Sequence, residues 1–180
     1  MLDLFLSDKY KSHWPAIQKL AIDESPEAFD QLRKYALEAY RLTAPALTLR
    51  DVGLETATIK DGEKELHVKK SDQLLMNFVA AGVDPAKYPD PYEIKLDRPE
   101  QDYIVFGYGS HSCVGREIVV TAMAAQLRVF GKLKNLRRAP GQAGMLKMVL
   151  GGGAFKLYMN ENWSDWTPYP ASLKVHFDDF

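Results

Sequence analysis

The single cysteine of the chain, Cys113, lies in a glycine-framed segment that limits what this part of the sequence can form. Residues 106–115 read F-G-Y-G-S-H-S-C-V-G, with Gly107 and Gly109 before the cysteine and Gly115 after it. Glycine adopts backbone conformations closed to residues with a Cβ, and it lets main-chain N–H groups approach a sulfur atom. One cysteine is too few for a zinc site or a C-x-x-C redox pair, but one thiolate is enough for an axial ligand of haem iron.

The segment after the cysteine predicts a helix over residues 115–133. Apolar side chains recur there at helical spacing, at Ile118, Val119, Ala122, Met123, Val129 and Phe130. The positive end of this helix therefore points at Cys113 and favours the thiolate. A free cysteine is most often a small buried hydrophobic residue, but the glycine loop and the helix N-terminus together favour a metal ligand here.

The rest of the chain predicts two more helices, a hairpin, a long loop and strands in the tail. Helical spacing covers residues 13–22 and 27–42, Ser25 followed by Pro26 is typical of a helix start, and Pro45 is expected to end the second helix. Residues 54–59 and 65–69 predict a hairpin around Asp61-Gly62, and residues 76–81 are expected to be partly helical. Prolines and aspartates predict an irregular loop over 83–100, and alternating apolar residues predict strands in 155–159 and 173–177.

Composition indicates one globular domain, residues 1–180. Apolar residues make up 46% and charged residues 26%, which is typical of a packed chain. The net charge of -1 gives no electrostatic reason to expect a nucleic-acid partner. We find no signal peptide and no apolar run of spanning length, and a lone cysteine excludes an internal disulfide and favours a reducing, cytoplasmic compartment.

Residues 106–115 resemble the haem-binding loop of cytochrome P450, whose pattern is F-x-x-G-x-x-x-C-x-G. The positions that fit it are Phe106, Gly109, Cys113 and Gly115. Further landmarks of the family follow in the expected order: Glu38 and Arg41 resemble the E-x-x-R of its K helix, Arg50 lies where a propionate-binding arginine is common, residues 84–91 resemble its meander, and Arg98 matches the third member of its Glu-Arg-Arg cluster.

The tail resembles a narrower group, the fungal fatty-acid dioxygenase fusions that include linoleate diol synthases and psi-factor-producing oxygenases. The similarity lies in residues 136–141, 155–159 and 169–177. In that group a dioxygenase half is joined to a haem-thiolate half that isomerises a fatty-acid hydroperoxide. The resemblance implies an N-terminal dioxygenase and a distal P450 portion upstream of this chain.

The resemblance implies a mainly α fold with small β-sheets, the C-terminal (proximal haem side) portion of the cytochrome P450 fold without its distal I helix. It implies haem b with Cys113 as the iron ligand, and it places the following residues at the cofactor: Cys113, Phe106, Gly109, His111, Gly115 and Arg50. It makes Glu38, Arg41 and Arg98 a structural cluster rather than catalytic residues, and we expect no catalytic residue in this chain because the distal residues are missing.

The expected activity is oxidative lipid chemistry, the conversion of a fatty-acid hydroperoxide to a dihydroxy fatty acid in oxylipin biosynthesis. Three alternatives stay open. The chain is a fragment of a conventional monooxygenase that needs a redox partner, a non-catalytic remnant, or a small haem-binding or sensing module. Arg50 and His111 are equally compatible with solvent-facing cations, and Phe106 with an ordinary core residue.

Overall fold

The computed structural model describes residues 1–43, 47–53, 55–151, 155–170 and 172–180. Helices of the described residues are α1 (Leu2–Phe5), α2 (Trp14–Ile22), α3 (Pro26–Thr43), α4 (Phe78–Ala81) and α5 (Arg116–Lys132). Short 3-10 helices are η1 (Lys11–His13), η2 (Glu100–Asp102), η3 (Ile104–Phe106), η4 (Gly109–His111) and η5 (Gly141–Gly144). The strands are β1 (Leu47–Asp51), β2 (Thr56–Asp61), β3 (Lys64–Lys69), β4 (Gln73–Asn77), β5 (Arg137–Arg138), β6 (Met148–Gly151), β7 (Phe155–Met159), β8 (Trp166–Thr167) and β9 (Val175–His176).

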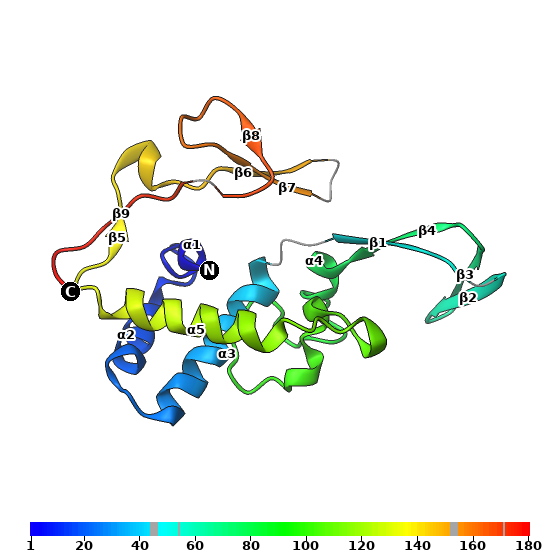
Figure 1. Cartoon of the computed structure of the whole chain (residues 1–180), viewed down its shortest axis with the longest axis horizontal. Helices are drawn as coiled ribbons and strands as arrows, with labels where there is room; N and C mark the ends of the chain where they lie inside the picture. The colour runs from blue at the N-terminus through cyan, green and yellow to red at the C-terminus, as the bar shows by residue number, and fades with distance from the viewer. Residues whose placement is uncertain (44–46, 54, 152–154, 171) are drawn as a thin grey trace.

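Helices α2, α3 and α5 lie side by side and form the main core (Figure 1). Ile17, Leu32 and Leu127, one from each helix, are completely buried between them. Complete burial of such a side chain is worth about 1.5–3 kcal/mol. The helices α2 and α5 approach closely at Gly131, where a Cβ would lie 2.6 Å from the Cβ of Ala21. Apolar burial on three amphipathic helices therefore fixes the frame on which the cysteine loop rests.

Both long helices follow the sequence prediction closely. Helix α3 begins at Pro26, and the Ser25 Oγ accepts a hydrogen bond from the Ala28 N–H at 3.2 Å, which satisfies one of the free donors of the first turn. Helix α5 begins at Arg116, one residue later than the periodicity indicated. Pro45, which was expected to end the helix over residues 27–42, lies outside the described residues.

Within the described ranges, the strands form four small antiparallel sheets, ordered β1-β4, β2-β3, β5-β9 and β6-β7-β8. In Figure 1 the first two extend to one end of the molecule, and β6-β7-β8 lies above the helices. The hairpin prediction is confirmed over β2 and β3, where Gly62 adopts a φ of 59° in the turn, whereas Leu54 lies outside the described residues. No described helix is long and apolar enough to cross a membrane.

Residues 76–81 were expected to be partly helical, and this is confirmed, because α4 covers Phe78–Ala81, while Met76 and Asn77 belong to the strand β4. The apolar run Leu74-Leu75-Met76 pairs with β1, a partner that local periodicity cannot show. In the tail, the strand at 155–159 is confirmed, but the one expected over 173–177 is reduced to the two residues of β9, which pair with β5.

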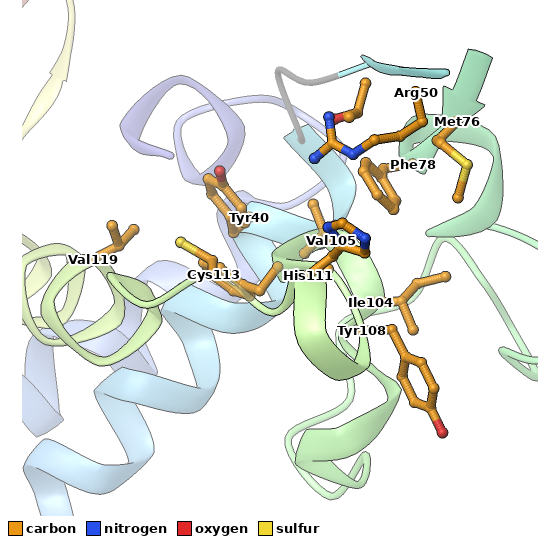
Figure 2. Close-up of a pocket in the computed structure, with 13 residues that line it drawn as sticks. Tyr40, Arg50, Met76, Phe78, Ile104, Val105, Tyr108, His111, Cys113 and Val119 are labelled. Atoms are coloured by element: carbon orange, nitrogen blue, oxygen red, sulfur yellow. The ribbon is translucent and has the colours of Figure 1, made fainter. Parts of the chain in front are cut away.

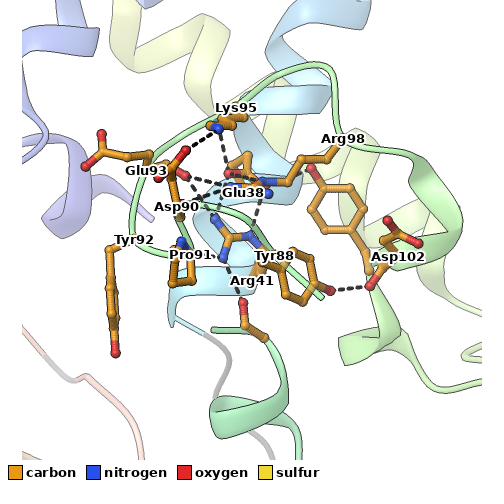
Figure 3. Close-up of polar contacts among 12 residues, drawn as sticks. Glu38, Arg41, Tyr88, Asp90, Pro91, Tyr92, Glu93, Lys95, Arg98 and Asp102 are labelled. Carbon is orange, nitrogen blue, oxygen red and sulfur yellow. Dashed lines mark hydrogen bonds and ion pairs between the residues drawn. The ribbon is translucent and has the colours of Figure 1, made fainter. Parts of the chain in front are cut away.

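The irregular segment 83–100 is ordered by a buried charged group on α3 (Figure 3). Glu38 is 0% and Arg41 is 1% exposed. Arg41 donates to Glu38 through Nε and Nη2, both at 2.8 Å. Its guanidinium also donates to the carbonyl oxygens of Gly82 at 2.7 Å, of Pro91 at 2.6 Å and of Glu93 at 3.1 Å. One arginine thus ties α3 to the start and to the middle of the segment.

Three further groups complete the Glu38 cluster. The Lys95 N–H donates to Glu38 Oε2 at 3.1 Å, the Arg98 Nε at 3.4 Å, and the Tyr103 hydroxyl donates to Oε1 at 2.9 Å. Burial, with the negative charge of Glu38, raises the pKa of Tyr103 far above its usual value, so this phenol remains a donor. Glu38, Arg41 and Arg98, the three residues that the resemblance grouped together, therefore do lie together, and Tyr103 is an addition that the sequence did not indicate.

Removing the carboxylate should unfold this region. Glu38→Ala would leave Arg41 buried without its counterion, and breaking a buried pair in this way costs about 3–5 kcal/mol. We expect the free energy of unfolding, measured by urea denaturation, to fall by that amount. Glu117→Ala is the matched control, because Glu117 also pairs with an arginine, Arg33 at 2.7 Å, but its side chain is 66% exposed. Equal effects of the two substitutions would contradict the structural role of the Glu38 cluster.

Candidate functional site

The cysteine loop is a tight return of the chain from η3 to α5. The Cys113 N–H donates to the Phe106 carbonyl oxygen at 2.6 Å, which closes the loop at its base. Gly107 has a φ of 83° and a ψ of -177°, a region open essentially only to glycine. A Cβ at Gly107 would also overlap the backbone oxygen of His111. The loop can close in this way because residue 107 is a glycine, and a side chain at this position would clash with the backbone of His111.

Cys113 lies just before the N-terminus of α5. The Arg116 N–H donates to the Cys113 carbonyl oxygen at 3.2 Å, and Gly115 is the N-cap residue of the helix. The thiol is exposed, and a Cβ built on Gly115 would lie 3.8 Å from Sγ. The free N–H groups of the first helical turn and the helix dipole favour negative charge near the sulfur. The local fold therefore presents one exposed thiol just before a helix N-terminus.

The thiol opens onto a cavity of about 690 Å³, called here the Cys113 cavity (Figure 2). This volume falls within the range of about 300–1,000 Å³ that is usual for bound small molecules and cofactors. The cavity is bordered by Tyr40, Thr48, Arg50, Met76, Phe78, Ile104, Val105, Phe106, Gly107, Tyr108, His111, Cys113 and Val119. Most of these side chains are apolar or aromatic, so the cavity suits an apolar group.

Two of the expected cofactor residues, Arg50 and His111, border the same cavity as Cys113. Arg50 lies in β1, and its Nη1 donates to the Leu49 carbonyl oxygen at 3.0 Å. His111 is the last residue of η4, two positions before the cysteine. Figure 2 shows both side chains on the side of the cavity away from Val119, with Cys113 between them and that residue. The cavity thus combines apolar sides with cationic or polar nitrogen donors at one edge.

Phe106 is 6% exposed and forms the floor of the loop. Its ring stacks on Tyr40 with a centroid separation of 4.7 Å and an interplanar angle of 15°, and the Arg116 guanidinium lies 5.8 Å from the ring centroid. Its neighbours in the second apolar core are Leu37, Tyr103, Val105 and Val120. Phe106 therefore has both roles weighed from the sequence, since it is a core residue and it also borders the cavity.

The remaining expected residues do not border the cavity. Gly109 has a φ of 56° with open space around it, and Gly115 caps α5, so both act through the backbone of the loop. Sequence reasoning missed Tyr40, which was read only as part of a helical stripe. Burial and the nearby Cys113 raise the pKa of the Tyr40 hydroxyl, so the phenol is neutral. Its position next to Arg41 was the available signal.

Within the described part of the chain, no group of three or more His, Cys, Asp or Glu side chains is placed to hold a metal ion.

Comparison with curated proteins finds fungal fatty-acid oxygenases. The chain is 38% identical over 177 residues to psi-producing oxygenase A of Emericella nidulans, an alignment that covers 98% of this chain and 16% of that protein. It is 34% identical over 179 residues to a bifunctional dioxygenase–epoxy alcohol synthase of Pyricularia oryzae, in an alignment that covers 99% of this chain and 16% of that protein. It is 27% identical over 217 residues to the 7,8-linoleate diol synthase of the same fungus, in an alignment that covers 99% of this chain and 18% of that protein. The chain thus spans less than a fifth of these relatives, and the resemblance noted in its tail is confirmed.

A scan against models of protein families found no match. Among solved structures, the tirandamycin C-bound P450 monooxygenase TamI gives a TM-score of 0.67 at 18% identity, over 98% of this chain and 38% of that one. The P450 heme domain of Tepidiphilus thermophilus gives 0.62 at 22% identity, over 78% and 31%. These identities show the fold alone. The chain has part of the cytochrome P450 fold, and the expected mixture of helices with small sheets is confirmed.

The loop geometry predicts that Gly107 and Gly109 differ in tolerance to a side chain. Gly109→Ala should cost about 1–2 kcal/mol, the usual penalty of a left-handed backbone for a residue with a Cβ. Gly107→Ala should cost more, because the same substitution also forces the loop away from the His111 backbone oxygen. Urea denaturation of both variants measures the difference. If Gly107→Ala is as stable as Gly109→Ala, the loop conformation described above is wrong.

Proposed function

We propose that this chain, which has part of the cytochrome P450 fold and is homologous to a segment of fungal psi-producing oxygenases and linoleate diol synthases, forms the thiolate side of a haem site in an oxylipin-forming enzyme. The observation that supports this best is the position of Cys113. The one thiol of the chain lies before the N-terminus of α5 and opens onto an apolar cavity that Arg50 and His111 also border.

The residues present fit haem. The apolar border of the Cys113 cavity matches the flat ring of a porphyrin, and its volume of about 690 Å³ is in the range for a bound cofactor. A haem carries two carboxylates, and Arg50 and His111 offer N–H donors at one edge of the cavity. A single sulfur without a cluster of other metal-binding side chains in the described residues is the donor set that an axial thiolate requires.

In this proposal each residue has a distinct task. Cys113 holds the iron through its thiolate, which the N-terminus of α5 stabilises. Phe106 excludes water on the loop side of the sulfur, since its ring is almost completely buried. Arg50 and His111 bind the carboxylates through charge-assisted hydrogen bonds. When bound, a haem with a thiolate ligand supplies cleavage of a peroxide O–O bond.

The proposed reaction of the longer protein is an isomerisation of a fatty-acid hydroperoxide. The O–O bond breaks, one oxygen stays on its carbon as a hydroxyl, and the other replaces a C–H by a C–OH elsewhere on the same acyl chain. The product is a dihydroxy fatty acid, and no electrons from outside are needed. We further propose that the hydroperoxide comes from a dioxygenase part of the same polypeptide, because dioxygenase and diol synthase appear in the names of the relatives.

The ligand role of Cys113 is tested by a carbon monoxide difference spectrum of the natural full-length protein. We expect the wild type to show the red-shifted band of thiolate ligation, and Cys113→Ser to lose it, because a serine hydroxyl does not supply a thiolate. Ser112→Ala is the matched control, since it changes the neighbouring loop residue and leaves the sulfur in place. A Cys113→Ser variant that keeps the band would exclude Cys113 as the ligand.

The reaction class is tested by supplying linoleate hydroperoxide to the same protein without NADPH or a reductase. Mass spectrometry should detect a dihydroxy acid, and Cys113→Ser should abolish it. Formation of an epoxy alcohol would change the product class and keep the reductase-free chemistry. A strict requirement for NADPH and a reductase would instead support a conventional monooxygenase. Haem binding without turnover of either kind would support a binding module, and no haem binding would support a remnant.

A further inference from the structure

Tyr40 stands between the buried charges of α3 and the cysteine loop. It lies one residue before Arg41, which is held by Glu38 and by three carbonyl oxygens of the segment after α4. The backbone of α3 at Tyr40 is therefore fixed. From this fixed point the Tyr40 ring stacks on Phe106, at 4.7 Å and 15°, and it borders the Cys113 cavity.

The stack reaches the cysteine through the backbone of Phe106. The Phe106 carbonyl oxygen accepts the Cys113 N–H at 2.6 Å, so the position of Phe106 sets the position of the residue that carries the thiol. Figure 2 shows the Tyr40 ring next to the Cys113 side chain, on the same side of the cavity. A shift of the Phe106 ring would therefore move the base of the loop and the sulfur with it.

We propose that Tyr40 is a positioning residue for Cys113, and that it acts through the face of its ring rather than through its hydroxyl. The ring has a defined stacked partner in Phe106, and such aromatic pairs contribute beyond the area they bury. The effect of Tyr40 on haem ligation rests on the proposed function. Its effect on the position of the cysteine loop does not, because that loop is part of the protein itself.

The first test uses the haem-free full-length protein and measures hydrogen exchange of the loop that contains the Cys113 amide. Tyr40→Leu removes the stack and should increase the exchange rate about two- to tenfold, the range that corresponds to the usual contribution of an aromatic pair. Tyr40→Phe keeps the ring and should exchange like the wild type. Tyr40→Met has no flat ring, but its flexible, unbranched side chain fills irregular gaps, and it replaces Tyr40→Leu if that variant does not fold.

Tyr35→Leu is the matched control. Tyr35 lies on the same helix, is 5% exposed and packs edge-on against Phe5 in the main core, away from the cysteine loop. Its loss should lower global stability and leave the exchange of the loop, relative to that of a core peptide of α5, unchanged. Faster hydrogen exchange of the loop in Tyr35→Leu, or an unchanged exchange rate in both Tyr40→Leu and Tyr40→Met, would overturn the inference. If the loop of Tyr40→Phe exchanges as fast as that of Tyr40→Leu, the proposed role of the ring is wrong.

The second test adds haem and uses the carbon monoxide spectrum. Tyr40→Leu should convert part of the thiolate-type band to the band of the protein without thiolate ligation, and Tyr40→Phe should restore it. A full thiolate band in Tyr40→Leu would count against the inference. If the wild type itself shows no thiolate band, the proposed function fails, and the exchange measurements still decide whether Tyr40 positions the loop.

Discussion

The buried carboxylate of Glu38 is the interaction on which the rest of the structure depends. An isolated buried charge is costly, and a buried ion pair stabilises only when further hydrogen bonds satisfy it. Glu38 has those partners, because Arg41, Arg98, Tyr103 and the Lys95 backbone donate to it. Arg41 belongs to α3, Lys95 and Arg98 to the segment 83–100, and Tyr103 follows η2. The charge therefore selects one conformation for a proline-rich stretch that forms no helix or strand over residues 83–99.

The same cluster reaches the cysteine loop by two routes. On one route Tyr103 binds Glu38 through its hydroxyl, and its carbonyl oxygen accepts the Phe106 N–H at 3.3 Å. On the other, Arg41 fixes α3, whose neighbouring residue Tyr40 stacks on the Phe106 ring. Both routes converge on Phe106, whose carbonyl oxygen holds Cys113. A structural charge cluster and a candidate ligand thus form one continuous unit, although neither Glu38 nor Arg41 borders the cavity.

The sequence predicted what depends on local periodicity or on a motif, and it missed what depends on contacts between distant residues. Helices α3 and α5 were visible because apolar residues recur at helical spacing in both. On α5 the predicted face was wrong, because the buried residues are Val120, Ala124, Leu127 and Gly131, whereas Ile118 and Val129 are exposed. The strand β4 was hidden because its partner β1 is more than twenty residues away. Tyr103 and Tyr40 were missed for the same reason, since a tyrosine in sequence shows neither the carboxylate nor the ring that it meets in the fold. For the candidate site, the motif indicated Cys113, the order of the family landmarks indicated Arg50, and closeness to the cysteine indicated His111, and all three border one cavity.

Apolar side chains near the Cys113 cavity are exposed to solvent, and this bears on what these residues can do in the proposed function. Val114 and Ile118, on either side of the start of α5, are 103% and 74% exposed, and Leu49, Leu75 and Met76 of the sheet β1-β4 are about half exposed. Exposed apolar side chains of this density mark surfaces that another part of a protein covers. The chain spans 38% of a P450 structure and 16% of a fungal relative, so the longer proteins hold ample sequence to cover them. In the proposed function, Cys113 accordingly holds the iron, and Arg50 and His111 bind the carboxylates of the haem. The exclusion of water from the reacting peroxide then falls to the rest of the longer protein, which would cover the exposed apolar residues beside the Cys113 cavity.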